Sequence, residues 1–362
     1  TLFQEEGAPL ELRIDEISEG YARTIQATQV DGELYALHAG AARPGSIAAA
    51  AALGEPLSLF MELPQLTASS APYGLWAAAC AEPWSGGLAV YRRSGSRFEL
   101  NRRITAPATM GETLDPLPWG PPGRRLRAKL RLRLHHGALQ SITEEDLLNG
   151  GNLAAIGSPE LGFELLQFET ATLVAPSTYE ITSLLRGQLG SAPEIHALRP
   201  AGASFVRLDE ATVQLAMRSA DLGLAIDWRI GPASRNLGDG TYREETASLS
   251  GLALRPLAPC QLRARRSGDD VLFTWIRQTR IDGDSWELAE VPLAEEFEYY
   301  ELTIHDAGAA TRSVSLAEPF YRYRREDQLA DFGQSPAVFT IAIAQRSAAY
   351  GLGAAAEATL HI

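Results

Sequence analysis

Residues 124–134 alternate between basic and apolar side chains with a regularity that leaves few choices of local structure. Leucine or alanine stands at 126, 128, 130, 132 and 134, and arginine or lysine stands at 125, 127, 129, 131 and 133. Successive side chains of an extended strand point to opposite faces, so this period of two collects the apolar groups on one side. The segment predicts a strand with one buried face and one solvated face, as antiparallel sheets have.

Strand-like segments recur along the rest of the chain, and only one short helix is expected. Residues 141–150 predict that helix, because Ser141 or Thr143 can cap it, acidic residues follow at its N-terminal end, and Asn149 and Gly150 end it. Long helices do not alternate with the strands, which argues against a parallel α/β architecture. We therefore expect a mainly β protein built from antiparallel sheets.

The chain of 362 residues is long enough for two or three domains. Residues 1–56 form a strand-rich N-terminal segment followed by an alanine- and glycine-rich linker, and residues 57–255 form a central β-rich domain. Residues 256–362 contain about seven short strands in about 100 residues, with Trp275 as a large core candidate, which is typical of a sandwich. We expect a fibronectin-III-like sandwich there.

The charge balance narrows the possible partners. The chain has 32 basic and 45 acidic residues, for a net charge of −13, whereas a general nucleic-acid binder needs a cationic surface. No window approaches the roughly 20 apolar residues of a membrane-spanning helix. Cys80 and Cys260 could pair only if the fold brought them together, and we interpret them as buried free thiols.

Motifs for catalysis are missing from the sequence. It contains no Gly-x-Ser-x-Gly, no phosphate-binding loop, no His-Glu-x-x-His and no Cys-x-x-Cys. The pair His135 and His136 is interpreted as a solvated turn rather than a metal site, because zinc needs three or four ligands. We expect no catalytic residue, no cofactor and no metal.

The basic face of residues 125–133 is the first candidate contact surface, with Arg127, Lys129 and Arg131 at its centre. Like charges on one strand face repel each other unless something acidic covers them. One interpretation is a solvated face, or an edge that its charge keeps from aggregating. The other is contact with an acidic neighbouring subunit or an anionic envelope polysaccharide, and contact with nucleic acid is the least favoured.

The second candidate is the loop that carries Arg277, Arg280, Asp282, Asp284 and Trp286. It is either a sandwich loop with internal salt bridges and a packed tryptophan, or a contact for a sugar or a subunit. In a sugar site the charged groups would bond hydroxyls and the indole would stack on a pyranose. Calcium is a third possibility, although it needs about 6–8 oxygen ligands and only two carboxylates lie at short spacing.

Several blocks of the sequence, in this order, resemble one protein family. The blocks are residues 147–156, 183–190, 228–232, 251–259, 275–286 and 290–293. They resemble the C-terminal region of the large tail-tip protein (host specificity, baseplate) of gene transfer agents and related prophages. The resemblance spans roughly residues 57–362, with Gln278 and Ala294 standing where the family has arginine and glycine.

The resemblance implies a non-catalytic structural module of a phage-like tail tip or baseplate. Such a module would be made in the bacterial cytoplasm. In the particle it would form a homo-oligomer and assemble with other tail-tip or baseplate proteins. It would act at the host envelope, where host surface polysaccharide is a further expected partner. The alternative is a carbohydrate-binding module that recognises the receptor, and a glycan hydrolase is the least favoured. The family's glycosidase-like barrel and hub domains are not recognisable in this sequence.

Overall fold

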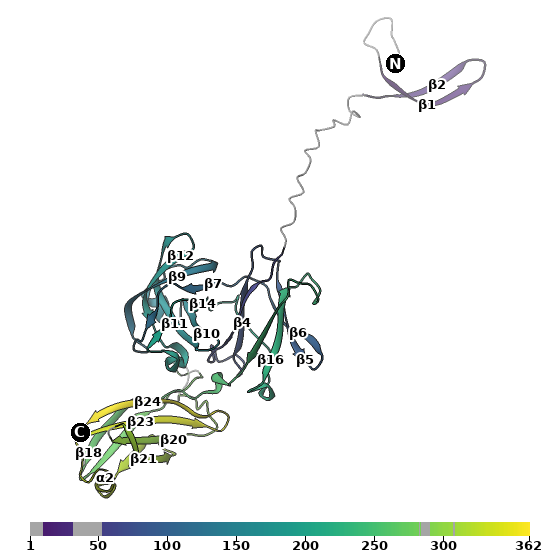
Figure 1. Cartoon of the computed structure of the whole chain (residues 1–362). Coiled ribbons are helices and arrows are strands. Elements are labelled where there is room, and N and C mark those ends of the chain that lie inside the picture. The colour runs from purple at the N-terminus through teal and green to yellow at the C-terminus, as the bar shows by residue number, and fades with distance from the viewer. Residues whose placement is uncertain (1–9, 32–52, 282, 284–289, 307) are drawn as a thin grey trace. The chain divides into compact units, whose positions relative to one another are not determined.

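The computed structural model describes residues 10–31, 53–281, 283, 290–306 and 308–362, and the chain divides into two compact units, residues 1–51 and 52–362 (Figure 1). In the first unit, β1 (Leu12–Glu19) and β2 (Arg23–Gln29) form an antiparallel hairpin with an irregularity between Ile14 and Glu16. The described residues include no helix that is both long and apolar enough to cross a membrane.

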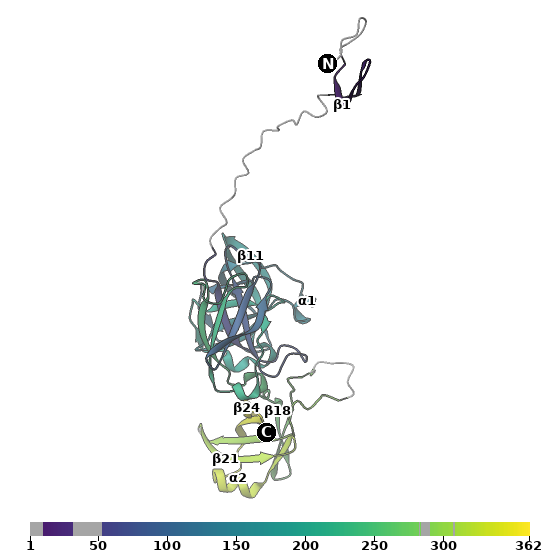
Figure 2. The ribbon, with the colours of Figure 1, turned by 90° about the vertical axis from the view of Figure 1, so that its right-hand side faces the viewer.

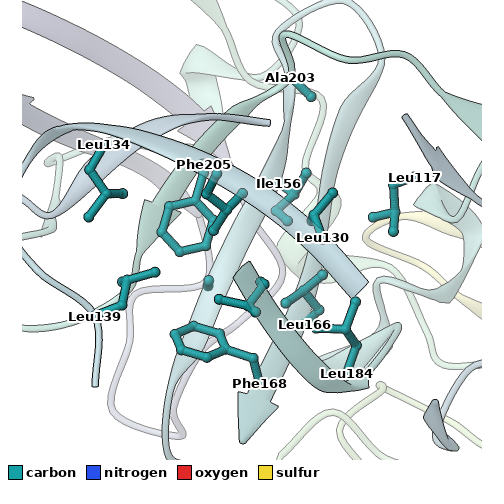
Figure 3. Close-up of a cluster of buried hydrophobic side chains, with 13 residues drawn as sticks. Leu117, Leu130, Leu134, Leu139, Ile156, Leu166, Phe168, Leu184, Ala203 and Phe205 are labelled. Atoms are coloured by element: carbon teal, nitrogen blue, oxygen red, sulfur yellow. The ribbon is translucent and has the colours of Figure 1, made fainter. Parts of the chain in front are cut away.

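Six strands of the second unit close into a barrel, in the order β10-β11-β12-β9-β7-β14. The predicted basic strand is β9, and its apolar face points into the barrel, where Leu130 and Leu134 share one buried cluster with Phe168 and Phe205 (Figure 3). The barrel strands are β7 (Met110–Thr113), β9 (Arg125–His136), β10 (Leu153–Ser158), β11 (Gly162–Ala175), β12 (Thr178–Leu185) and β14 (Ser204–Arg207).

Two further sheets complete the central region. The first has the order β15-β4-β3, and the second has the order β17-β16-β5-β6. Their strands are β3 (Leu57–Glu62), β4 (Leu75–Cys80), β5 (Leu88–Ser94), β6 (Arg97–Ile104), β15 (Val213–Gln214), β16 (Ala225–Pro232) and β17 (Arg243–Ser248).

The three-stranded sheet is buried on both faces, because alternate residues of its strands enter different cores. Phe60 and Ala77 pack with Trp228 of the four-stranded sheet. Met61 and Ala78 pack against the outer wall of the barrel. The central region is therefore layered, with the barrel, the three-stranded sheet and the four-stranded sheet in that order, and the ribbon shows β4 between β10 and β16 (Figure 1).

The predicted short helix is α1 (Glu144–Leu148), which begins after Thr143 and ends at Asn149. The Thr143 hydroxyl accepts from the amide of Asp146, and the Asp146 side chain accepts from the amide of Thr143, so the two residues form a capping box. Short paired strands, β8 (Leu117–Pro118) and β13 (Leu198–Arg199), lie beside the barrel.

The C-terminal region is a sandwich of a three-stranded sheet, β18-β19-β22, and a four-stranded sheet, β21-β20-β23-β24 (Figure 2). Trp275 is buried between the sheets, edge-on to Tyr300, and Phe273 packs on Phe339. The elements are β18 (Cys260–Ser267), β19 (Asp270–Ile276), β20 (Tyr300–Asp306), β21 (Ala309–Leu316), β22 (Phe320–Tyr323), α2 (Arg325–Phe332), β23 (Val338–Ser347) and β24 (Gly351–His361). The expected fold class, multi-domain and mainly β with antiparallel sheets, is confirmed.

Closure of the barrel gives a first testable prediction. Gly111 pairs with both Leu134 and Phe205, and a Cβ added there would lie 2.2 Å from the Arg133 carbonyl oxygen and 2.8 Å from the Leu134 Cα. We expect Gly111→Ala to lower the free energy of unfolding by about 1–3 kcal/mol, because two strands must separate to admit the methyl group. Urea unfolding measures the loss.

Gly240→Ala is the matched control for this substitution. A Cβ at Gly240 would meet no heavy atom within 4 Å. Equal losses of stability for the two variants would contradict the proposed role of close strand approach at Gly111.

Candidate functional site

Four of the five cations on the outer face of β9 pair with acidic side chains of the same chain. The acids come from the neighbouring strands β12 and β7, from β11, from α1 and from the segment after β7. The pairs are Arg125 with Glu144 and Glu169, Lys129 with Glu180, Arg131 with Asp115, and Arg133 with Glu112. The acidic groups expected to offset the repulsion between these cations therefore belong to the same chain.

These pairs are mostly exposed, so each contributes little stability. Lys129 Nζ lies 2.8 Å from Glu180 Oε1 while 69% of the Lys129 side chain is exposed, and exposed pairs contribute about 0.2–1 kcal/mol. Their main effect is to cancel the repulsion between cations two residues apart. Within the described part of the chain, the Arg127 side chain forms neither an ion pair nor a hydrogen bond, which leaves its guanidinium to solvent.

Arg131 has the most complete pairing on this face. Its Nη2 lies 2.6 Å from Asp115 Oδ1, and its backbone amide donates to Asp115 Oδ2 at 3.1 Å. The side-chain hydrogen bond from Arg131 lowers the pKa of Asp115 below its ordinary value of 3.8, and the backbone bond adds to this while partial burial opposes it. The carboxylate thus fixes the position of the Arg131 head group.

The second candidate is described only in part. Asp282, Asp284 and Trp286 lie outside the described residues. Arg277 donates from Nη1 to the Pro292 carbonyl at 2.8 Å and from Nη2 to the Val291 carbonyl at 2.9 Å. These bonds join the two ends of the segment that follows β19.

Arg280 ties the same segment to the central region. Its Nε lies 3.1 Å from Glu295 Oε1, and its Nη1 donates to Gln65 Oε1 at 3.0 Å and to the Ala253 carbonyl at 3.3 Å. Burial raises the pKa of Glu295, and the nearby Arg280 opposes that rise. Arg277 and Arg280 line one cleft of about 600 Å³ with Gln65, and none of the β9 cations lines it. The β9 cations and the pair Arg277 and Arg280 therefore do not line a common cleft.

A buried ionic cluster lies at the barrel. The Arg186 guanidinium pairs with the Glu164 carboxylate of β11, with Nη2 2.6 Å from Oε2, and both side chains are almost fully buried. Arg199 is buried as well, and its guanidinium donates to the carbonyls of Gly162 and Glu194. Desolvation lowers the pKa of Arg199. The sequence signal for this pair is Glu164, a charged residue inside the apolar run 163–166. A charge in a buried strand needs a partner, so a nearby cation is expected.

The histidine and cysteine residues form no ligand set. His135, His136 and Cys80 line a hollow of about 220 Å³. No group of three or more potential ligands occurs among the described residues. Burial, with a smaller contribution from the Glu82 charge, raises the pKa of the Cys80 thiol to about 11, so the thiol is protonated at neutral pH. Cys80 and Cys260 are both free, as expected, but only Cys80 is buried, and Cys260 is half-buried.

The barrel is also the part of the chain that matches a known family. The first barrel strand in the chain, β7, and the last, β14, are hydrogen-bonded to each other. The stretch that forms the barrel therefore begins and ends on neighbouring strands. Residues 108–206 match the family described as Rcc01698-like, C-terminal. No curated protein matches the chain.

The Rcc01698-like match and the closed barrel have almost the same limits. The match begins two residues before β7 and ends within β14. Residues 147–156 and 183–190, two of the blocks that resemble the tail-tip family, lie inside it, and the other four blocks lie outside. The Rcc01698-like match therefore concerns the barrel, which is well under half of the chain.

The buried ion pair of the barrel gives a second prediction. Glu164→Ala should lower the free energy of unfolding by about 3–5 kcal/mol, because Arg186 would be left buried without its counter-charge. Glu180→Ala is the matched control, since it removes a carboxylate from an exposed pair on the same barrel and should cost under about 1 kcal/mol. Guanidinium unfolding measures both, and similar losses would contradict the argument.

The β9 face gives a third prediction. Arg131→Ala should raise the pKa of Asp115 toward its ordinary value, as measured by NMR titration of the Asp115 carboxyl carbon. Because the pKa is lowered in the folded state, the associated stability is present above the ordinary pKa and is lost as the pH falls through the lowered one.

Arg127→Ala removes a cation from the same face without touching a partner and should leave the Asp115 pKa unchanged. An Asp115 pKa that moves equally in both variants would show a general field effect instead of a specific pair.

Proposed function

We propose that this chain is a non-catalytic structural module of a phage-like tail tip or baseplate, of the gene transfer agent and prophage type. It would assemble with copies of itself and with other tail-tip proteins, and it would present surfaces to the host envelope. In this proposal it is made in the bacterial cytoplasm and acts in the tail of the particle.

The observation that carries the proposal is that three features fall on one stretch of the chain. The closed barrel, the Rcc01698-like match and two of the ordered tail-tip blocks fall on the same stretch of chain. The remaining blocks continue in order through the four-stranded sheet and the C-terminal sandwich. Because the blocks lie in several folded regions and keep the expected order, they support a resemblance of the whole module and not of one segment.

The chemistry of the candidate sites agrees with a scaffold role. Four of the five cations of β9, Arg186 in the barrel and Arg280 at the C-terminal region bind carboxylates or carbonyls of this chain. Charged groups that are paired within the chain hold its segments in place. Because they are already paired, they suit a structural role better than the binding of a substrate.

The test is the location of the chain in particles. An epitope-tagged chain is expressed from its own locus in the bacterium that encodes it, released particles are banded on a density gradient, and the tag is located with gold-labelled antibody. We expect the chain to co-sediment with particles and the gold to label the tail tip. A chain found only in the soluble cell fraction, with unlabelled particles, would refute the proposal.

The carbohydrate-binding alternative has a separate readout. The purified chain is applied to an array of bacterial envelope glycans, with Trp286→Ala and Asp284→Ala as variants of the candidate loop. A structural module shows no saturable binding. Saturable binding that both variants lose would favour receptor recognition, and release of reducing ends from the glycan would favour a hydrolase.

A further inference from the structure

The outer face of the sheet β18-β19-β22, in the C-terminal sandwich, gathers three arginines. Ala264, Phe273 and Tyr323 pack in the sandwich core, so the residues that alternate with them along the three strands point outward. The register of the sheet places these outward residues in two rows, Arg265–Leu272–Arg322 and Arg263–Thr274–Phe320. Three guanidinium groups therefore share one sheet face.

Acidic side chains on the same strands are few. β18 and β22 contain none, and Asp270 is the one acid of β19. Asp270 already accepts from Arg322 Nε at 2.8 Å and from the Arg325 amide at 2.9 Å. Glu318, in the segment before β22, forms no ion pair within the described part of the chain. Of the three arginines, Arg322 is thus the one that has a carboxylate partner among the described residues.

Arg263 and Arg265 stand side by side without a counter-charge. Both residues are exposed, and outward positions two residues apart on a strand lie about 6–7 Å apart. As far as the structure is described, the Arg265 side chain forms neither an ion pair nor a hydrogen bond. Arg263 donates from Nη2 to Gln261 Oε1 at 3.3 Å, which satisfies a donor but adds no negative charge.

The contrast with β9 shows what this face lacks. On β9 four of the five cations bind acids of neighbouring elements, and the unpaired Arg127 stands between the paired Arg125 and Lys129. Like charges on one strand face repel each other. The repulsion is offset from within the chain on β9, whereas no acid among the described residues offsets it between Arg263 and Arg265.

Apolar groups lie exposed beside these arginines. Phe320 shares a row with Arg263 and is 45% exposed, and Ile276, further along β19, is 50% exposed. Leu272 lies in the other row and is half-buried. Protein interfaces combine arginine with apolar and aromatic side chains in this way. A face that only had to remain solvated would not need the apolar groups.

The hydrogen-bonding groups of the face favour an acidic polypeptide over an anionic polysaccharide. Guanidinium groups donate and do not accept, and the Asp270 carboxylate already has two donors. Sugar hydroxyls also donate, and the Thr274 hydroxyl is the outward acceptor left to them in the two rows. A polypeptide supplies carboxylates and apolar side chains without that excess of donors.

The shape of the face favours a macromolecule over a small ligand. Small ligands bind in concave sites that enclose most of their surface. The clefts of about 590, 600 and 910 Å³ elsewhere in the chain include none of the three arginines. A partner would therefore reach them from the open side of a sheet.

We propose that the outer face of β18-β19-β22 binds an acidic surface segment of a different polypeptide, with carboxylates on Arg263 and Arg265 and apolar side chains on Phe320 and Leu272. An arginine binds a carboxylate through two parallel hydrogen bonds, and apolar contacts around such a pair exclude water. The chain as a whole has a net charge of −13, so this basic face would orient an acidic partner that the rest of the surface repels. The inference does not depend on the proposed function.

The test is the affinity of the full chain for polymers of defined chemistry, measured by biolayer interferometry. The probes are poly-L-glutamate, a random copolymer of glutamate and tyrosine of similar length, polygalacturonate and oligothymidylate. We expect the copolymer to bind most tightly, because it alone offers both carboxylates and apolar groups. Poly-L-glutamate should bind more weakly, and the polysaccharide and the nucleic acid should bind least.

Variants locate the binding. Arg263→Glu with Arg265→Glu should weaken copolymer binding by about tenfold or more, because like charges then face each other. Arg97→Glu with Arg127→Glu is the matched control, since it makes the same change in net charge at two exposed arginines that form no ion pair among the described residues. This control should bind the copolymer normally. Phe320→Ser should lower the affinity for the copolymer to that for poly-L-glutamate.

Arg263→Gln with Arg265→Gln removes the two charges without adding acids and should also weaken binding, and urea unfolding of each variant checks that the sandwich stays folded. Three outcomes overturn the inference: neither polypeptide polymer binds, the Arg97 and Arg127 control loses as much affinity as the charge reversal, or polygalacturonate or oligothymidylate binds more tightly than the copolymer. Self-association in sedimentation velocity that the charge reversal abolishes would assign the face to a second copy, and would overturn it as well.

Discussion

Every strand edge in this chain leaves a row of backbone groups that must be paired, shielded or solvated, and the fold follows from how each edge meets that requirement. The pairing of β7 with β14 completes the closure of the six-stranded barrel, which leaves that sheet without a free edge. At Gly111 the neighbouring strand approaches so closely that a single methyl group would lie 2.2 Å from a carbonyl oxygen. The three-stranded sheet then has to be enclosed by its neighbours, because apolar residues line both of its faces.

Charge is organised around the same strands. Outside the barrel, the β9 cations alternate with acids from adjacent strands, and since those pairs are exposed they prevent repulsion more than they add stability. Inside, Glu164 and Arg186 are shielded from water, so each depends on the other. Arg280 performs a related task at the C-terminal region, where it joins a loop to Gln65 and Ala253. The same kind of side chain thus serves solubility, core integrity and the attachment of one region to another, according to its burial.

Local patterns anticipated much of this structure. The alternation in residues 125–133 identified β9 and its buried face, Thr143 and Asn149 marked the ends of α1, and Trp275 was recognised as a core residue. The helix α2 was not anticipated, because Arg325–Phe332 has a weak apolar stripe and is held by the buried side chain of Gln328, which donates to the Tyr323 carbonyl. The acidic partners of β9 could not be predicted from local sequence patterns either, since Glu180 lies 51 residues from Lys129 along the chain.

By itself the sequence determined which segments are extended and which of their faces are apolar, because side-chain alternation depends only on neighbouring residues. It also carried the ordered blocks that resemble the tail-tip family. Only the tertiary structure decided that six strands close into a barrel and that Glu164 meets Arg186. Those outcomes depend on contacts between residues far apart in the chain, and no local period records which distant edge a strand will meet.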